Sequence, residues 1–183
     1  MTTNTQAQQR LGDVIADFSL PLLEGGHLSL QAFLTGRKAA VVVFWSGICS
    51  HCRRYDDYCN RLSERYPGVG LLAVASRQNE SVQMLRAAVA ERGLRFPMVH
   101  DADRAVANAW FVPQTPRVFL LDPQGRLLYR GAIDNFKYPQ DPEFVPYLDT
   151  AIEACLAGKT PSRAETPSFG CPVESVFYTL PKP

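Results

Sequence analysis

The stretch AAVVVFW at residues 39–45, followed by SGICSHC at residues 46–52, decides the fold. Its first part is an unbroken apolar run with adjacent valines, which predicts a β-strand covered on both faces. After the strand, the less polar positions recur at the spacing of one helix face. These positions are Cys52, Tyr55, Cys59, Leu62 and Tyr66. Two cysteines with two residues between them therefore stand where a buried strand turns into a helix.

The rest of the chain alternates strands and helices. Apolar β-branched runs predict strands, helical periodicity predicts helices, and glycines or the turn sequence Asp-Pro-Gln-Gly predict where they end. The expected strands are 69–75, 117–121 and 127–130, with two short extended pieces within 18–30 and another at 96–99. The expected helices are 52–66, 81–92, 103–110 and 144–156.

This order predicts an α/β fold, with a central mixed β-sheet flanked by helices and an N-terminal β-hairpin. One domain is expected over residues 1–158. Residues 159–183 are rich in Pro, Ser and Thr and are expected to form an extended tail that packs on or near the same domain. The sequence shows no internal repeat and no linker that would separate two domains.

Composition excludes several classes of partner. The net charge of +1 gives no electrostatic case for nucleic acid or for a membrane surface. No apolar run approaches the roughly 20 residues that a bilayer helix needs. The polar start MTTNTQAQQR lacks the features of a secretory signal, so a cytoplasmic location is expected, although an exported form with its signal removed stays open.

The pair Cys49 and Cys52 points to redox chemistry. A helix N-terminus favours a thiolate, so Cys49 is expected to be an exposed nucleophile. Cys52, one turn later, is placed to attack a mixed disulfide and release the product. His51 beside the sulfurs either carries a positive charge that stabilises the thiolate or faces solvent with no role. With five cysteines, at least one has no partner within the chain.

The residues that surround this pair resemble a known family. Phe44-Trp45 before the two cysteines resembles the active-site strand and helix of thioredoxin-like proteins, and Thr115-Pro116 before RVFLLD resembles their Thr-Pro segment. The helix at 81–92 is similar to an insertion in the TlpA-like and AhpC/TSA (peroxiredoxin-like) branch, and PSFGC at 167–171 resembles the Gly-Cys tail of some of its small redoxins. The resemblance spans residues 10–172.

The resemblance implies a thioredoxin-like fold and a cis peptide bond at Thr115–Pro116, next to the sulfurs. The bend would present the backbone of Thr115 to an extended substrate strand. Trp45 is expected to shape the surface at the site, and Ser50 and His51 between the cysteines resemble more oxidising members. Tyr55 stands where TlpA-like proteins often have Glu, so an internal base for Cys52 is expected to be missing, unless Asp56 or Asp57 takes its place.

The leading hypothesis is a thiol–disulfide oxidoreductase that acts on a protein or small-molecule disulfide with a thiol redox partner and no cofactor or metal. One alternative is a peroxiredoxin-like thiol peroxidase, because Ser46 stands three residues before Cys49 and Cys52 or Cys171 would resolve a sulfenic acid. Another is a metal-binding module similar to copper chaperones, with His100 as the distant ligand. Metal coordination by a single close cysteine pair is not expected.

The other cysteines divide into two groups. Cys59 and Cys155 lie on apolar helical stripes and are expected in the core, because free cysteine packs as a small hydrophobe. Cys171 follows Gly170 in the tail with no apolar rhythm around it. For Cys171, a reactive or resolving thiol and an incidental one fit the sequence equally well.

Overall fold

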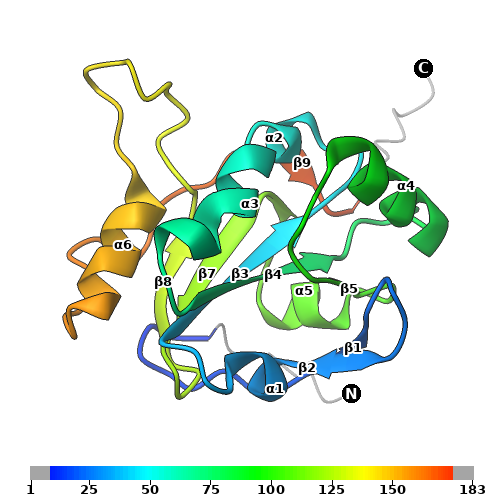
Figure 1. The fold of residues 1–183 in the computed structure, drawn as a ribbon, viewed down its shortest axis with the longest axis horizontal. Coiled ribbons are helices and arrows are strands. Elements are labelled where there is room, and N and C mark those ends of the chain that lie inside the picture. Colours follow the sequence, from blue (N-terminus) through cyan, green and yellow to red (C-terminus); the bar gives the residue numbers. More distant parts are fainter. Residues whose placement is uncertain (1–8, 175–183) are drawn as a thin grey trace, which may run out of the picture.

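The computed structural model describes residues 9–174. Its centre is a five-stranded mixed sheet with the strand order β5-β4-β3-β7-β8, which Figure 1 shows with helices on both sides. The strands are β3 (Ala39–Trp45), β4 (Val69–Ala75), β5 (Met98–His100), β7 (Arg117–Leu121) and β8 (Leu127–Gly131). β3 pairs parallel with β4 and antiparallel with β7, so the apolar stretch at 39–45 is the central strand, and the predicted mixed sheet is confirmed.

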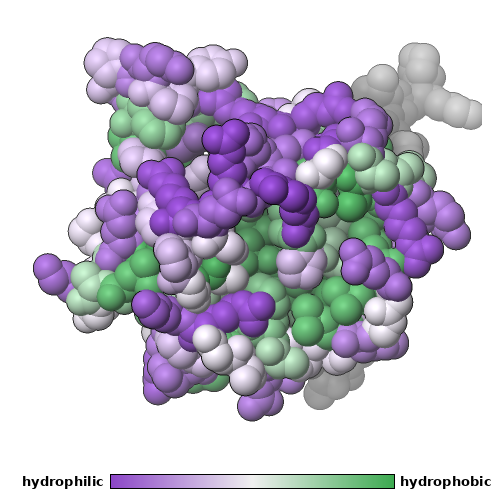
Figure 2. Space-filling model, in the orientation of Figure 1, coloured by the Kyte–Doolittle hydropathy of each residue, from purple (hydrophilic) through white to green (hydrophobic). Residues whose placement is uncertain are grey.

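Both faces of β3 are buried because its side chains alternate between two apolar layers. Val41, Val43 and Trp45 join the layer beneath α3 (Asp56–Arg65), α4 (Val82–Arg92) and α6 (Tyr147–Leu156). Val42 and Phe44 join the opposite layer with α1 (Leu30–Leu34) and α5 (Ala105–Ala109). In the view of Figure 2, hydrophilic residues cover the outside of α3, and hydrophobic residues show between α3 and α4.

The N-terminal hairpin is also confirmed. β1 (Ser19–Pro21) and β2 (His27–Ser29) pair antiparallel beside α1. The helix predicted at 81–92 is α4, whose N-cap Ser81 accepts a hydrogen bond from the backbone N–H of Met84. It ends at Gly93, whose φ of 61° lies in the left-handed region that glycine adopts without strain. None of the described helices is long and apolar enough to cross a membrane.

The prediction of one continuous helix over residues 52–66 is wrong. The segment forms α2 (Ser50–Arg53) and α3, with a turn at Arg54 and Tyr55 between them. Both turn residues bind the loop that follows β8: the Tyr55 hydroxyl donates to Asp134 at 2.6 Å, and the Arg54 guanidinium donates to the carbonyl of Lys137 at 2.6 Å. These hydrogen bonds join the turn to the loop after β8.

The tail returns across the molecule to the sheet. Backbone hydrogen bonds join Arg130 to Ala164 and Thr166. Residues 114 and 115 form the short strand β6 (Gln114–Thr115), which pairs antiparallel with β9 (Cys171–Pro172). Figure 1 shows β9 beside α2, at the end of the central strands where the paired cysteines lie. The sequence did not predict α1, β6 or β9.

Candidate active site

Cys49 is the N-cap of α2, in the connection that leaves the end of β3. The loop before it is held by Glu80, a buried carboxylate whose Oε1 accepts a hydrogen bond from the backbone N–H of Ile48 at 3.2 Å. Only 1% of Cys49 is exposed, so the prediction of an exposed nucleophile is wrong for this conformation. The sulfur is covered by other parts of the chain, and β9 is one of them.

Hydrogen bonding makes Cys49 acidic. Its pKa is lowered to about 4, chiefly by the hydrogen bond from the Cys52 thiol. Burial opposes ionisation, but further hydrogen bonds from Cys171, from Thr115 and from the backbone N–H of Cys52 favour the thiolate. The four-residue α2 contributes through that backbone group, and the neighbouring side chains contribute most of the effect.

Cys52 has the opposite character. It is buried, and burial together with the neighbouring Cys49 thiolate raises the pKa of Cys52 well above its usual value. Of the two sulfurs, Cys52 therefore keeps its proton and Cys49 carries the negative charge. This asymmetry is what a pair needs if one sulfur attacks a disulfide and the other acts later.

Thr115 lies against Cys49 from the other side. The Thr115–Pro116 peptide bond is cis, as the family resemblance implied. When Cys49 is protonated, its thiol donates to the backbone carbonyl of Thr115 at 3.2 Å. The Thr115 hydroxyl is buried, and no side chain or backbone group among the described residues accepts or donates a hydrogen bond to it. The Thr115 side chain lowers the pKa of Cys49 and also that of Cys52, so it favours a thiolate at either sulfur.

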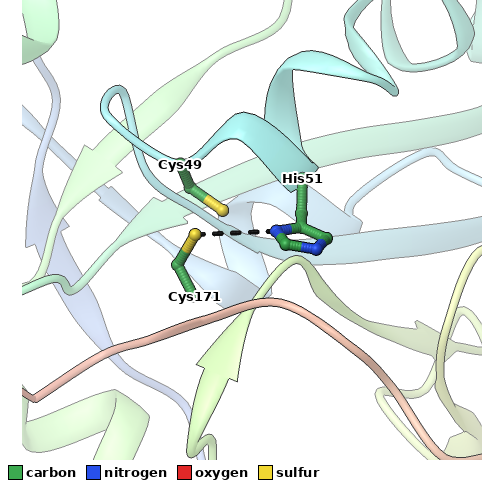
Figure 3. Close-up of side chains that lie close together, drawn as sticks. All are labelled: Cys49, His51 and Cys171. Atoms are coloured by element: carbon green, nitrogen blue, oxygen red, sulfur yellow. Dashed lines mark hydrogen bonds between the residues drawn. The ribbon is translucent and has the colours of Figure 1, made fainter.

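Cys171 and His51 complete the group. Figure 3 shows the sulfur of Cys171 pointing toward that of Cys49, with the His51 ring beside it. The Cys171 sulfur lies 3.7 Å from His51 Nδ1, and the two sulfurs and a His51 nitrogen all lie within 4.8 Å of one another. Burial and the Cys49 thiolate raise the pKa of Cys171, against a smaller lowering effect of Arg77.

Other residues singled out in the sequence lie elsewhere. Trp45 does not shape the surface, because it is buried beneath the Arg92 guanidinium, 4.4 Å from its ring centroid. Ser50 is exposed in the first turn of α2. Asp56 is bound by Arg92 through two hydrogen bonds, and so it is not a free base for Cys52.

The other residues singled out in the sequence also lie outside the group around Cys49. Asp57 forms an exposed ion pair with Arg61, away from any role as a base for Cys52. Cys59 is buried as expected, and Cys155 is half-buried. His100, the ligand expected for a metal site, is not part of the Cys49, His51 and Cys171 group.

Sequence reasoning missed Glu80, Arg77 and Gly170. Glu80 and Arg77 lie in the connection after β4, where no local pattern connects them with the cysteines. Gly170 packs so closely on the chain that a Cβ at this position would overlap the carbonyl oxygen of Thr115. The Gly-Cys pair in the tail was a signal for this approach, but its partner Thr115 is visible only in the folded chain.

Within residues 9–174, Cys49, His51 and Cys171 form the group that could hold a metal ion. Two thiolates and an imidazole are ligands that suit Cu(I) and zinc. Because Cys49 alone has a lowered pKa, a bound cation would have to displace the proton of Cys171. The arrangement can therefore serve either thiol exchange or coordination, and both use Cys49.

Comparison with known proteins agrees with this architecture. The chain matches the AhpC/TSA family over residues 11–130. It is 31% identical over 117 residues to the thiol-disulfide oxidoreductase ResA of Geobacillus thermodenitrificans, which covers 64% of this chain and 66% of that protein. The chain thus spans just under two thirds of the length of this curated relative.

Solved structures extend the likeness to the whole fold. A hypothetical protein from Sinorhizobium meliloti 1021 superposes with a TM-score of 0.79 at 28% identity, over 91% of this chain and 95% of that one. The thioredoxin domain of a thiol-disulfide oxidoreductase from Bacteroides vulgatus gives a TM-score of 0.59 at 21% identity, over 67% and 89%. With the sheet order and the matched family, these likenesses show that the chain belongs to the AhpC/TSA family and has the thioredoxin-like fold.

Proposed function

We propose that the protein is a thiol–disulfide oxidoreductase in which Cys49 attacks and Cys52 resolves. The observation that carries the proposal is the geometry of the site: Cys49 is the N-cap of α2, Cys52 lies one turn later, and Thr115 lies against the Cys49 sulfur. In this setting the pKa of Cys49 is lowered and that of Cys52 is raised. The relatives named thiol-disulfide oxidoreductase support the same activity. Thr115 is the proposed docking residue, because its backbone lies beside the attacking sulfur.

The reaction runs in two exchange steps. The Cys49 thiolate attacks one sulfur of a substrate disulfide, and the other substrate sulfur leaves as a thiolate. Cys52 then loses its proton to solvent or to the departing thiolate and attacks Cys49. The bond between Cys49 and the substrate breaks, the second substrate thiol leaves, and the protein keeps the two-electron oxidation as a Cys49–Cys52 disulfide. The reverse sequence oxidises a substrate dithiol.

The acidity of Cys49 makes the protein a comparatively strong oxidant. With a pKa of about 4, the thiolate is favoured over the thiol at neutral pH by about 4 kcal/mol. That stabilisation belongs to the reduced form alone, since a disulfide carries no proton. For a two-electron couple it raises the reduction potential by about 90 mV relative to a dithiol whose first pKa lies above neutrality.

The test is a comparison of Cys49→Ser with Cys155→Ser. Both replace one thiol by a hydroxyl, but Cys155 is a half-buried residue of α6 outside the site. Exchange with a fluorescent model disulfide should be lost in Cys49→Ser and unchanged in Cys155→Ser. Normal exchange in Cys49→Ser would remove the proposal.

Coordination of a soft metal ion is a second candidate function, favoured by the grouping of Cys49, His51 and Cys171 within 4.8 Å. It differs from the sequence-based prediction because Cys171 and His51 take the places of Cys52 and His100. Metal content of protein purified under reducing conditions decides: a stoichiometric ion lost in His51→Ala supports coordination, and protein free of metal contradicts it.

The remaining parts of the proposal concern partners and location. The proposed substrates are protein or small-molecule disulfides, recycled by a thiol partner, and the proposed location is the cytoplasm. Peroxidase activity has no comparable support. The hydroxyl of Ser46 is buried without a hydrogen-bond partner among the described residues, and Arg77 lowers the pKa of Cys171 rather than that of Cys49.

A further inference from the structure

The acidic sulfur of Cys49 is covered by a tail segment that itself carries a thiol, that of Cys171. Cys49 is 1% exposed, although exchange requires its sulfur to meet a substrate sulfur directly. The Cys171 sulfur occupies the neighbouring position, within 4.8 Å. A sulfur of an incoming disulfide would have to approach the same place.

The backbone around Cys171 is held as a docked strand. Thr115 and Cys171 are register partners in the antiparallel β6–β9 pair. The backbone of Gly170 packs against the Thr115 carbonyl so closely that no side chain fits. The edge of the chain that is proposed to receive an extended substrate is therefore already occupied by residues of the tail.

Anchors on both sides fix the position of Cys171. On one side, the side-chain amide of Gln114 donates to the carbonyl oxygen of Ser168. On the other, Val173 is buried, its N–H donates to Pro113 at 3.0 Å, and its carbonyl accepts from Gln78 at 3.0 Å. Cys171 itself is only half-buried, so its placement comes from the backbone and from these anchors.

We propose that residues 168–173 are a tethered internal substrate, and that Cys171 is a third redox thiol that forms a disulfide with Cys49. The proposal rests on the proposed thiol–disulfide exchange at Cys49 and goes beyond it. The tail then acts as a gate, because it must leave before an external disulfide can reach Cys49. It also acts as a relay, because Cys171 replaces Cys52 in the disulfide with Cys49 when the tail docks again.

The relay step needs no external oxidant. Starting from the Cys49–Cys52 disulfide, the Cys171 thiol passes its proton to the adjacent His51 and its sulfur attacks Cys49. The Cys49–Cys171 bond forms, the Cys49–Cys52 bond breaks, and Cys52 leaves as a thiolate that takes up one proton. One disulfide is exchanged for another, and Cys52 returns to the protonated form that its buried site favours.

The first experiment uses Cys52→Ser, so that only Cys171 can resolve Cys49. The protein is treated with oxidised glutathione in the presence of a chelator, quenched in acid, alkylated and mapped by mass spectrometry. The expected product is an intramolecular Cys49–Cys171 disulfide. In Cys52→Ser with Cys171→Ser, the Cys49–glutathione adduct should persist about a hundredfold longer, because the effective concentration of the tethered thiol is lost.

The outcomes separate the two proposals. A Cys49–glutathione adduct that persists in Cys52→Ser despite an intact Cys171 overturns the relay and leaves the Cys49–Cys52 exchange standing. Failure of Cys49 to react with oxidised glutathione in every variant overturns both. Cys52→Ser with Cys155→Ser is the matched control and should form the Cys49–Cys171 disulfide at the rate of Cys52→Ser alone.

A second measurement tests the gate without changing a thiol. Gly170→Ala places a methyl group against the Thr115 carbonyl, which should lift β9 from β6. Alkylation of Cys49 by a bulky maleimide is expected to be about tenfold faster than in the unchanged protein, as for a local opening made easier by about 1.4 kcal/mol. Phe169→Ala removes an exposed side chain next to Gly170 and is the control. Equal alkylation rates in all three proteins would contradict the gate.

Discussion

Replacing Thr115 by valine tests what makes Cys49 acidic. The Thr115 side chain is buried, its hydroxyl makes no hydrogen bond within the described residues, and it lowers the pKa of Cys49 and also that of Cys52. Valine keeps the shape of the side chain and removes the hydroxyl. The backbone carbonyl of Thr115, which accepts from the protonated thiol at 3.2 Å, is unchanged. The substitution therefore removes a hydroxyl that favours the thiolate form and keeps the carbonyl acceptor of the Cys49 thiol.

The size of the effect follows from one hydrogen bond to a charged acceptor. Such a bond is worth about 1.5–3 kcal/mol, and one pKa unit is about 1.4 kcal/mol. The pKa of Cys49 should therefore rise from about 4 by about one to two units. Because the reduced form loses this stabilisation, the reduction potential should fall by about 30–60 mV. The stability of the fold at a pH below 4 should not decrease, because the lost hydroxyl has no neutral partner.

The assay is ultraviolet absorbance of the thiolate in reduced protein as a function of pH. The acid limb of the titration belongs to Cys49, since the pKa values of Cys52, Cys59 and Cys171 are all raised. Thr150→Val is the control, because its exposed hydroxyl bonds only the carbonyl of Pro146 in its own helix. An unchanged midpoint in Thr115→Val would refute the role given to this hydroxyl.

Further predictions concern the scaffold around the site. Arg92→Met should lower the free energy of unfolding by about 3–5 kcal/mol in urea titrations, because it leaves the largely buried carboxylate of Asp56 without its cation. Cys59 should resist alkylation in the folded protein near neutral pH, because burial raises its pKa to about 12; rapid labelling would contradict the packing. Arg130 lowers the pKa of Glu165, so this pair stabilises the tail above the ordinary pKa of a glutamate and stops doing so as the pH falls through the lowered value. The protection factors of the amides of residues 164–166, which compare each exchange rate with the intrinsic rate at the same pH, should accordingly fall in acid, and protection factors independent of pH would show that the ion pair does not hold the tail.

The sheet was predictable because its signals are local. An apolar run such as 39–45 has few alternatives to a strand buried on both faces, and its alternation between two apolar layers follows from the pleat. The cysteine pair was located by the same logic, as residues directly after that strand. Ser81 and Gly93 marked the ends of a helix through capping chemistry that any sequence shows directly.

What could not be predicted depends on contacts between distant residues. At the break between α2 and α3, Tyr55 binds Asp134, 79 positions along the chain, and helical periodicity carries no information about that contact. The burial of Cys49 is decided by β9, whose two residues have no strand signal of their own and pair with β6 only because the tail returns there. The family resemblance placed Trp45 at the site surface, whereas Arg92 covers it.

The central claim is that Cys49 and a neighbouring thiol form a reversible disulfide whose reduced form is stabilised by an acidic sulfur. The most direct test is equilibration of the unchanged protein in glutathione redox buffers, with the oxidised fraction read by mass spectrometry. We predict a two-electron transition that requires Cys49, at a potential clearly above the value of about −270 mV typical of thioredoxin. A protein that forms no disulfide at Cys49, or one at a potential equal to or below that value, would contradict the account.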